Sequence, residues 1–199
     1  MSAAAVHDEL ELKAVIPDPE ALRARLLAAG AALRFGGRMS DRRYDRPGGE
    51  LSLRDQVLRV RTFHRADGHG ADGHATAILG WKGPVERSPE GYRRRAEIEL
   101  PVGGGERGAP HALLAALGYE VVHAIDREVE VYELEGATLR IERYPRMDPL
   151  LEIEGSPAAI ERAVEATGIP RAEFTADSLT EFVRRYELRS GHPAALTLT

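Results

Sequence analysis

Five segments of the chain alternate charged and aliphatic residues, and this pattern constrains the fold more than any other feature. The first segment is Glu9-Leu10-Glu11-Leu12-Lys13. The alternation returns in Leu58-Arg59-Val60-Arg61, Arg95-Ala96-Glu97-Ile98-Glu99-Leu100, Leu139-Arg140-Ile141-Glu142 and Leu151-Glu152-Ile153-Glu154. A β-strand sends successive side chains to opposite faces. The sequence therefore predicts a sheet with one apolar face and one charged face, and the charged face is the functional one.

Helix signals follow several of these strands. Three times a Glu-x-Glu segment is followed by a short connection, a predicted helix and a glycine, over residues 9–30, 97–118 and 152–168. Asp18-Pro19 and Ser156-Pro157 are typical helix starts, because the first residue can cap the helix and proline fits its first turn. This repeat predicts an α+β fold, a pseudo-symmetric barrel with helices packed outside.

The other expected elements are strands over residues 76–82, 119–134 and 137–144 and helices over residues 109–117 and about 177–188. The two strands after residue 118 form a hairpin that turns at Glu135-Gly136. No linker is long enough to divide the chain. We therefore predict one domain over residues 1–189 and a disordered tail over residues 190–199.

Composition excludes several classes of function. With 199 residues and 43% hydrophobic content, one well-packed domain is expected, and the net charge of −5 argues against a nucleic-acid-binding protein. Cysteine is absent, which excludes disulfides, thiolate metal sites and cysteine nucleophiles. No signal peptide is visible, and no apolar run reaches the roughly 20 residues of a membrane helix. We expect a cytoplasmic protein without membrane contact.

Two apparent motifs are rejected. Residues 103–108 fit the dinucleotide-binding pattern GxGxxG, but the strand before them carries a charge on every second residue, whereas a Rossmann strand is apolar throughout. His64, His69 and His74 lie near two aspartates, but their spacing within a glycine-rich segment fixes no metal geometry. We interpret residues 66–74 as a hairpin loop.

The charged face needs ligands of both signs. Its acids would be Glu9, Glu11, Glu97, Glu99, Glu142, Glu152 and Glu154, and its bases Lys13, Arg59, Arg61, Lys82, Arg95, Arg127 and also Arg140. Burying unpaired charges costs several kcal/mol each, so an enclosed face of this kind would be a wet cavity. Clustered carboxylates favour Mg²⁺ or Mn²⁺, and clustered guanidinium groups favour phosphate. The alternative is a solvated face on which the charges pair across strands.

The ordered set of motifs resembles the CYTH superfamily, the triphosphate tunnel metalloenzymes. Residues 9–13 resemble the ExExK signature of that family. The further matches are Arg59-Val60-Arg61, Lys82 before Gly83-Pro84, Arg95-Ala96-Glu97-Ile98-Glu99 and the closing Glu152-Ile153-Glu154. Residues 40–45 are similar to the segment before the second charged strand in class IV adenylyl cyclases and their prokaryotic relatives.

The resemblance implies a closed antiparallel barrel of about eight strands, forming a tunnel that binds a triphosphate. It assigns phosphate binding to Lys13, Arg59, Arg61, Lys82, Arg95 and Arg127. It assigns Mg²⁺ or Mn²⁺ to Glu9, Glu11, Glu152 and Glu154, with Glu97, Glu99 and Glu142 as further ligands or supporting groups. Catalysis would depend on Glu9, Glu11 and Lys13. The resemblance also suggests a homodimer.

The chain departs from the family pattern at two places. The family's later Lys-x-Arg is Ile125-Asp126-Arg127 here, so that only Arg127 carries over. In some members this lysine is implicated in positioning the attacking water. The aspartate often found before the closing strand is replaced by Glu142, a change of length that metal coordination can tolerate.

Three functions remain open from the sequence. Attack of water on the terminal phosphorus makes a triphosphatase acting on inorganic triphosphate, thiamine triphosphate or ATP, and we place this reaction first. Attack of the ribose 3′-hydroxyl of ATP on the α-phosphorus makes an adenylyl cyclase. The third function is a non-catalytic polyphosphate-binding module, which the substitution at Ile125 favours and the full set of carboxylates opposes.

Overall fold

The computed structural model describes residues 6–65, 76–102 and 108–198. Its strands are β1 (His7–Val15), β2 (Ala32–Asp45), β3 (Val57–Arg65), β4 (Thr76–Lys82), β5 (Glu86–Arg87), β6 (Arg93–Val102), β7 (Glu120–Leu134), β8 (Ala137–Arg143) and β9 (Leu150–Glu154). Its helices are α1 (Pro19–Ala28), α2 (Ala109–Ala116), α3 (Pro157–Thr167) and α4 (Leu179–Ser190), with short 3-10 helices at Ser52–Arg54 and Arg171–Glu173.

The strands are hydrogen-bonded in the order β1-β9-β8-β7-β2-β3-β4-β6-β5, and β1 also pairs with β6. This last pairing closes eight strands into an antiparallel barrel, with β5 as an extra strand. The α+β class and the closed barrel expected from the sequence are confirmed. Within the described residues, none of the helices is both long enough and apolar enough to cross a bilayer.

The chain divides into two compact units, and each consists of segments that are far apart in the sequence. The first unit contains Met1–Asp8, Gly37–Glu86 and Arg95–Asp126, and the second contains Glu9–Gly36, Arg87–Arg94 and Arg127–Thr199. Each unit has a hydrophobic core of its own. The single domain over residues 1–189 stays a prediction.

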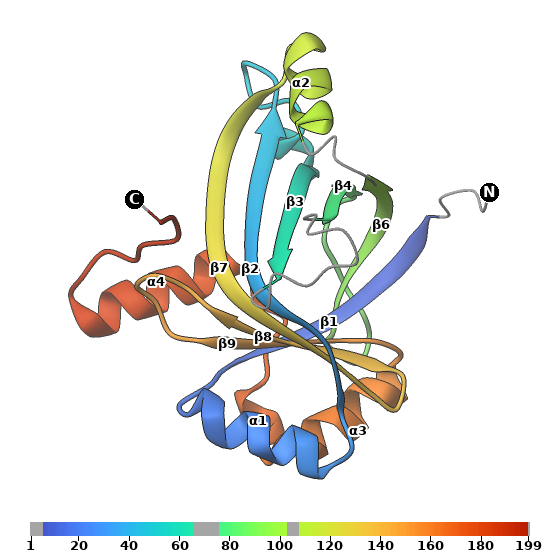
Figure 1. Cartoon of the computed structure of the whole chain (residues 1–199), viewed down its shortest axis with the longest axis vertical. Coiled ribbons are helices and arrows are strands. Elements are labelled where there is room, and N and C mark those ends of the chain that lie inside the picture. The colour runs from blue at the N-terminus through green and yellow to red at the C-terminus, as the bar shows by residue number, and fades with distance from the viewer. Residues whose placement is uncertain (1–5, 66–75, 103–107, 199) are drawn as a thin grey trace. The chain divides into compact units, whose positions relative to one another are not determined.

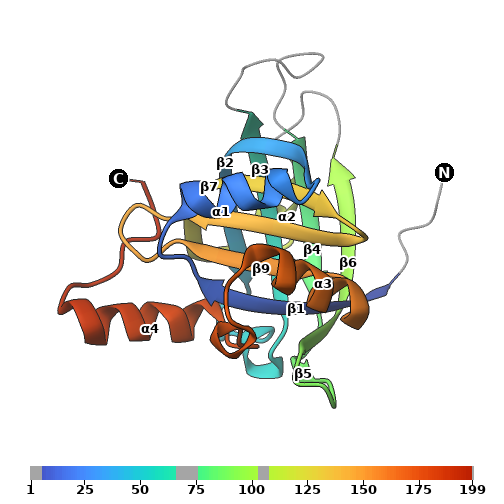
Figure 2. The same cartoon turned by 90° about the horizontal axis from the view of Figure 1, so that it is seen from below.

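The core of the second unit lies between its strands and two helices. α1 and α3 pack against each other, and α3 also packs on β8 and β9 (Figures 1 and 2). Leu12, Leu139 and Ile153 are almost fully buried there, and Leu12 is the register partner of Ile153. The aliphatic residues of the alternating segments therefore supply the apolar face that the helices cover.

The helices begin where the sequence signals place them. The Asp18 carboxylate accepts a hydrogen bond from the Ala21 backbone N–H at 3.0 Å, and Ser156 caps α3 in the same way. Gly168 ends α3 with φ +68°, a left-handed conformation that favours glycine. Glu135 and Gly136 form the expected tight turn between β7 and β8, with φ of 47° and 84°.

Two boundaries differ from the prediction. α4 begins at Leu179 rather than near residue 177, because Ser178 and Glu181 form a reciprocal capping box. The two-residue strand β5 is not among the strands predicted from the sequence.

The structure also differs in the predicted disordered tail. The backbones of Ala195 and Arg146 exchange hydrogen bonds in both directions, at 2.9 and 3.1 Å. The Glu187 side chain accepts a further bond from the Ala194 N–H. These bonds hold the segment after α4 against the chain.

The core of the first unit is smaller. Tyr44, Val60 and Leu114 are buried together, and Leu58, Leu79 and Tyr119 pack against them. Leu114 comes from α2, which begins directly after Gly108. Two predictions lie outside the described residues: the loop at residues 66–74 and most of the glycine-rich pattern at residues 103–107.

Candidate functional site

The first unit contains a buried cluster of opposite charges, which we call the β3–β6 cluster. It consists of Asp41, Arg59, Arg61, Lys82, Glu97 and Glu99. The register of strands β3, β4 and β6 brings these side chains together. Arg59 on β3 lies opposite Gly80 on β4, which lies opposite Glu99 on β6, and Lys82 on β4 lies opposite Glu97 on β6. Since these strands are adjacent and the charges share one phase, their side chains meet on one face.

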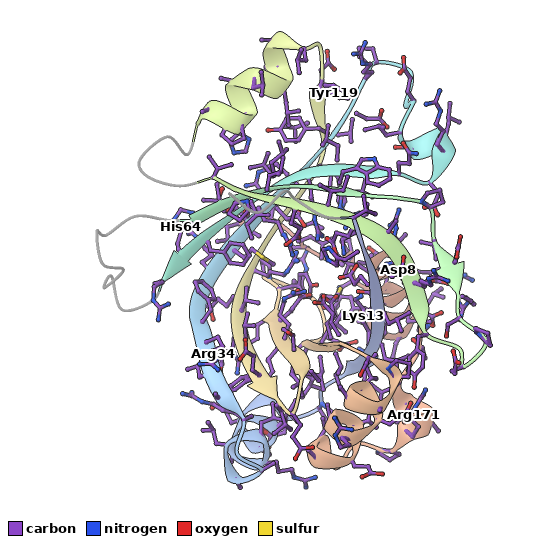
Figure 3. All side chains as sticks on the ribbon, turned by 90° about the vertical axis from the view of Figure 1, so that its right-hand side faces the viewer. Asp8, Lys13, Arg34, His64, Tyr119 and Arg171 are labelled. Atoms are coloured by element: carbon purple, nitrogen blue, oxygen red, sulfur yellow. The ribbon has the colours of Figure 1, made fainter. Side chains whose placement is uncertain are left out.

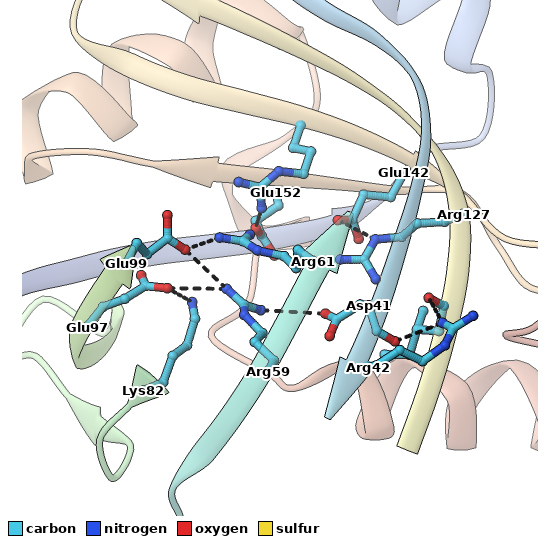
Figure 4. Close-up of polar contacts among 12 residues, drawn as sticks. Asp41, Arg42, Arg59, Arg61, Lys82, Glu97, Glu99, Arg127, Glu142 and Glu152 are labelled. Carbon is cyan, nitrogen blue, oxygen red and sulfur yellow. Dashed lines mark hydrogen bonds and ion pairs between the residues drawn. The ribbon is translucent and has the colours of Figure 1, made fainter. Parts of the chain in front are cut away.

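Arg59 is the centre of this cluster (Figure 4). Its guanidinium lies 3.2 Å from Glu97, 3.8 Å from Glu99 and 3.7 Å from Asp41. Arg61 also binds Glu99, and the Lys82 ammonium lies 3.2 Å from the Glu97 carboxylate. Three cations and three carboxylates thus balance one another within the cluster.

Burial alone would raise the pKa of Glu99, but Arg61, Arg59 and Lys82 outweigh it and lower the pKa below its ordinary value. This carboxyl group is therefore ionised at neutral pH. Arg59, Arg61, Lys82 and Glu97 are each less than one-tenth exposed. The alternative of a solvated charged face is excluded for these residues, although the charges do pair across strands.

Arg95 differs from the other predicted phosphate ligands. Its guanidinium donates to the backbone carbonyls of Gly83 and Asp55, both at 2.5 Å. Arg95 is buried. Through these two bonds it ties β6 to the segments around residues 55 and 83, and phosphate binding by Arg95 stays a prediction.

The second unit contains another buried set, the β1–β9 cluster, which combines residues of β1, β6, β8 and β9. Its members are Glu9, Glu11, Lys13, Arg93, Arg140, Glu152 and Glu154. β1 and β9 pair so that Glu11 lies opposite Glu154 and Lys13 opposite Glu152. Figure 3 labels Lys13 and Arg34, and the Lys13 side chain is buried whereas that of Arg34 is more than half exposed.

Lys13 joins two carboxylates of this cluster. Its ammonium lies 2.7 Å from both Glu11 and Glu152. Burial alone would lower the pKa of Lys13, but these two carboxylates outweigh that effect and raise the pKa above its ordinary value. The other oxygen of Glu11 accepts a bond from Arg93 at 2.6 Å.

Three carboxylates of the β1–β9 cluster could hold a metal ion. Oxygen atoms of Glu9, Glu11 and Glu154 all lie within 4.8 Å of one another. Burial and the neighbouring carboxylates Glu152 and Glu9 raise the pKa of Glu154 well above its ordinary value, despite Arg140. A divalent cation would relieve this repulsion, and hard cations prefer oxygen ligands. These residues fit Mg²⁺ or Mn²⁺.

Glu142 and Arg127, predicted as metal and phosphate ligands, form a pair with each other. The Arg127 Nε donates to Glu142 at 2.9 Å, and the Tyr144 hydroxyl donates to the other Glu142 oxygen at 2.5 Å. Burial and the Glu142 charge raise the pKa of Tyr144 well above its ordinary value. Both oxygens of Glu142 are therefore engaged by protein donors.

Ile125, which stands in place of the family lysine, is fully buried. Its backbone carbonyl accepts a hydrogen bond from Arg42 at 3.2 Å, and Arg42 also binds the Asp126 carboxylate at 2.8 Å. An aliphatic side chain at this position cannot hold or orient a water molecule through its own atoms.

The predicted residues thus fall into four groups. The β3–β6 cluster collects five of them, Arg59, Arg61, Lys82, Glu97 and Glu99. The β1–β9 cluster collects six, Glu9, Glu11, Lys13, Arg140, Glu152 and Glu154. Arg127 and Glu142 form a pair, and Arg95 makes separate contacts.

Sequence reasoning missed Asp41, Arg93 and Tyr144 as members of the site. Arg93 shares the phase of Arg95, Glu97 and Glu99, so extending the alternation by one step would have found it. Asp41 and Tyr144 had no such signal.

Comparisons with known proteins identify the fold. No protein-family model matches the chain, and no curated protein matches its sequence. A candidate adenylate cyclase from Vibrio parahaemolyticus matches the structure with a TM-score of 0.68 at 15% identity, covering 90% of this chain and 99% of that one. The PH1819 protein from Pyrococcus horikoshii matches with a TM-score of 0.65 at 22% identity, covering 92% and 99%.

A third solved structure, the candidate adenylyl cyclase HpAC1 from Hippeastrum, matches with a TM-score of 0.59 at 17% identity, covering 96% of this chain and 99% of that one. That protein is described as having a dominant triphosphatase activity. At these identities the likeness concerns the fold. The chain has the closed-barrel fold of these proteins, which is the fold that its resemblance to the CYTH superfamily implies.

Proposed function

We propose that this protein is a metal-dependent enzyme that hydrolyses the terminal phosphate of inorganic or organic triphosphates. The observation that supports the proposal is that two clusters of cations and carboxylates are buried. Burying charged groups costs desolvation free energy, and clusters of this kind are common where a protein binds a charged ligand. The triphosphatase activity described for the Hippeastrum protein supports the choice of reaction.

The cations of the β3–β6 cluster suit a polyphosphate. Arg59 and Arg61 present guanidinium groups whose donors match phosphate oxygens, and Lys82 adds a point charge. In the structure these cations bind Glu97, Glu99 and Asp41. A bound triphosphate would compete with these carboxylates for the three cations, and the negative charge that it adds is a reason why the function would require a divalent cation.

Glu9, Glu11 and Glu154 would hold the metal. When bound, Mg²⁺ or Mn²⁺ supplies positive charge that neutralises phosphate oxygens during displacement at phosphorus. Lys13 holds Glu11 and Glu152 in place through its two 2.7 Å contacts. The chain's own contribution is mainly positioning and electrostatic stabilisation, which dominate phosphoryl transfer.

Cyclisation of ATP to cyclic AMP and pyrophosphate is the second candidate, favoured by the names of the Vibrio and Hippeastrum proteins. It would need the same buried charges together with a ribose 3′-hydroxyl in place of water. The residues of the two clusters do not separate the two reactions.

The test incubates the purified protein with Mg²⁺ or Mn²⁺ and, separately, with inorganic triphosphate, thiamine triphosphate or ATP. Orthophosphate without cyclic AMP, lost in a Glu9→Ala, Glu11→Ala double variant, would support a triphosphatase. Cyclic AMP with equimolar pyrophosphate would support a cyclase. If neither product forms, the catalytic proposal fails and a polyphosphate-binding module remains.

A further inference from the structure

Arg43 on β2 and Arg59 on β3 are direct cross-strand neighbours. They are register partners, as are Asp41 and Arg61 two residues along the same pair of strands. Asp41 and Arg43 are two residues apart on β2, so their side chains leave the sheet on the same face. Because the Asp41 carboxylate lies 3.7 Å from the Arg59 guanidinium, that face is the one that carries the β3–β6 cluster.

Two arginines in this relation repel each other. Directly opposite residues of antiparallel strands have Cβ atoms about 4.5–5.5 Å apart, and like charges at such positions are destabilising. Arg59 is buried, and Arg43 is partly buried, with its Nε atom shielded from solvent. The Arg59 side chain extends over Gly80, where an added Cβ would lie 3.7 Å from both its Cγ and its Nε. The protein thus keeps two like charges side by side on a partly enclosed face, an arrangement that an anion bound to both would stabilise.

Arg43 also changes the charge balance of this face. The β3–β6 cluster itself has three cations and three carboxylates. With Arg43 included, four cations face three carboxylates, which leaves one net positive charge when all are ionised. Guanidinium groups stay protonated in proteins. The enlarged set therefore attracts an anion more strongly than the cluster alone.

His123 on the neighbouring strand β7 indicates how Arg43 lies relative to solvent. Burial lowers the pKa of His123, Arg43 lowers it further, and Asp41 opposes both effects. These three side chains are therefore within electrostatic reach of one another, and all belong to the first unit. His123 is exposed, Arg43 has intermediate exposure and Arg59 is less than one-tenth exposed. Arg43 is thus the more accessible of the two arginines to an anion in solution.

We infer that Arg43 is a further phosphate-binding residue, and that Arg43 and Arg59 together bind one phosphate group of the substrate. The inference rests on the proposed function, because it concerns the phosphate chain of the proposed substrate. The donors of two guanidinium groups match the oxygens of one phosphate. This phosphate would compete with Asp41 and Glu97, which lie 3.7 and 3.2 Å from Arg59.

The test measures binding of inorganic triphosphate to the full-length chain by isothermal titration calorimetry in EDTA, which prevents metal-dependent turnover. Arg43→Gln should raise the dissociation constant about tenfold, because one charged donor group is lost. Arg43→Lys keeps the charge but loses the fork of donors, so its dissociation constant should lie between those of wild type and Arg43→Gln. If Arg43→Gln does not fold, Arg43→Met removes the same charge and replaces it.

Arg38→Gln is the matched control. Arg38 lies on the same strand at an odd number of residues from Arg43, so its side chain leaves the opposite face of the sheet, and it is exposed. Its dissociation constant should equal that of wild type. Thermal unfolding of each variant with and without triphosphate separates binding from a structural role. A structural role would lower the midpoint of the chain alone and leave the rise caused by triphosphate unchanged, whereas we expect a smaller rise in Arg43→Gln.

A double variant, Arg43→Gln with Arg59→Gln, tests whether the two arginines share one phosphate group. If they do, the double variant should lose less affinity than the product of the two single losses, because either substitution alone already breaks the two-sided contact.

An Arg43→Gln chain that binds triphosphate as tightly as wild type would overturn the inference, as would a double variant whose loss equals that product. A wild-type chain that does not bind triphosphate in EDTA would also overturn it. Failure of the inference is distinguishable from failure of the proposed function. Metal-dependent phosphate release by a chain whose affinity does not depend on Arg43 leaves the function standing, whereas Arg43-dependent binding without phosphate release supports the inference and refutes the catalytic proposal.

Discussion

The ammonium of Lys13 lies 2.7 Å from a carboxylate oxygen of Glu152, and the two residues are register partners on β1 and β9. Both are less than one-tenth exposed. Because each charge is buried with its partner, removing one leaves an uncompensated charge inside the protein. The pair fixes the relation between the first and last charged strands of the second unit.

Lys13→Met should therefore lower the free energy of unfolding by about 3–5 kcal/mol. The measurement is urea unfolding of the wild-type and variant chains at neutral pH. Arg34→Met is the matched control, because Arg34 pairs with Glu133 at the surface, where both side chains are more than half exposed. The control should lose at most about 1 kcal/mol, and equal losses in both variants would contradict the prediction.

Arg59 contacts three carboxylates of the β3–β6 cluster and is proposed to exchange them for phosphate oxygens. Arg59→Gln should lower kcat/KM for the preferred triphosphate by about 100-fold, since one charged donor is lost at the reacting phosphate chain. Steady-state kinetics measures this effect. Arg54→Gln, at an exposed position of the same unit, should leave kcat/KM unchanged. A folded Arg59→Gln with wild-type kinetics would refute phosphate binding by Arg59.

The alternation of charged and aliphatic residues was sufficient to predict most of the barrel and most cluster members. Strand register aligns residues of the same phase, so Lys13 and Glu152, far apart in sequence, could be expected on one face. Helix starts were predictable because Asp18 and Ser156 act locally. The start of α4 was predicted about two residues too early, because Asp177 and Ser178 can both cap a helix. The side-chain geometry decides that Ser178 is the cap.

Asp41, which the sequence analysis missed, and Arg95, which it predicted, show what the alternation of residues cannot predict. Charges in β2 occupy both phases, so the pattern could not indicate that Asp41 points inward to Arg59. Arg95 has the correct phase, but its long side chain reaches the carbonyls of Gly83 and Asp55. The position of a residue in the alternation determines the face of the sheet on which its side chain lies. It does not determine which groups the end of a long, flexible side chain contacts.

Asp45 should make stability depend on pH in the acid range. Its carboxylate accepts hydrogen bonds from the N–H groups of Arg46, Leu51 and Ser52 and from the Ser52 hydroxyl, at 2.7–3.0 Å. Although burial opposes the charge, these donors outweigh it and lower the pKa of Asp45 to about 2.

Because this pKa is lower in the folded chain than in the unfolded one, the stabilisation is complete above about pH 4. It is lost as the pH falls toward 2. Asp45→Asn should thus be less stable than wild type at neutral pH, and the difference in unfolding free energy should shrink between pH 4 and 2. Glu50→Gln, exposed in the same loop, serves as control. A difference independent of pH would contradict the assignment.

Glu142 and Glu154 should respond differently to substitution when metal binding is measured. Glu154 belongs with Glu9 and Glu11 to the three carboxylates whose oxygens lie within 4.8 Å of one another. Glu142 is outside this group, and its carboxylate accepts bonds from Arg127 and Tyr144. Glu154→Gln should weaken Mn²⁺ binding at least about tenfold, since one of three charged ligands is lost. Glu142→Gln should leave Mn²⁺ affinity unchanged and lower thermal stability instead, because Arg127 loses its buried counter-charge.

Titration by electron paramagnetic resonance and thermal unfolding of the same samples separate the two effects. A Glu142→Gln chain with weakened Mn²⁺ binding and unchanged stability would return Glu142 to the metal ligands and would show that Arg127 and Tyr144 release it when the ion binds.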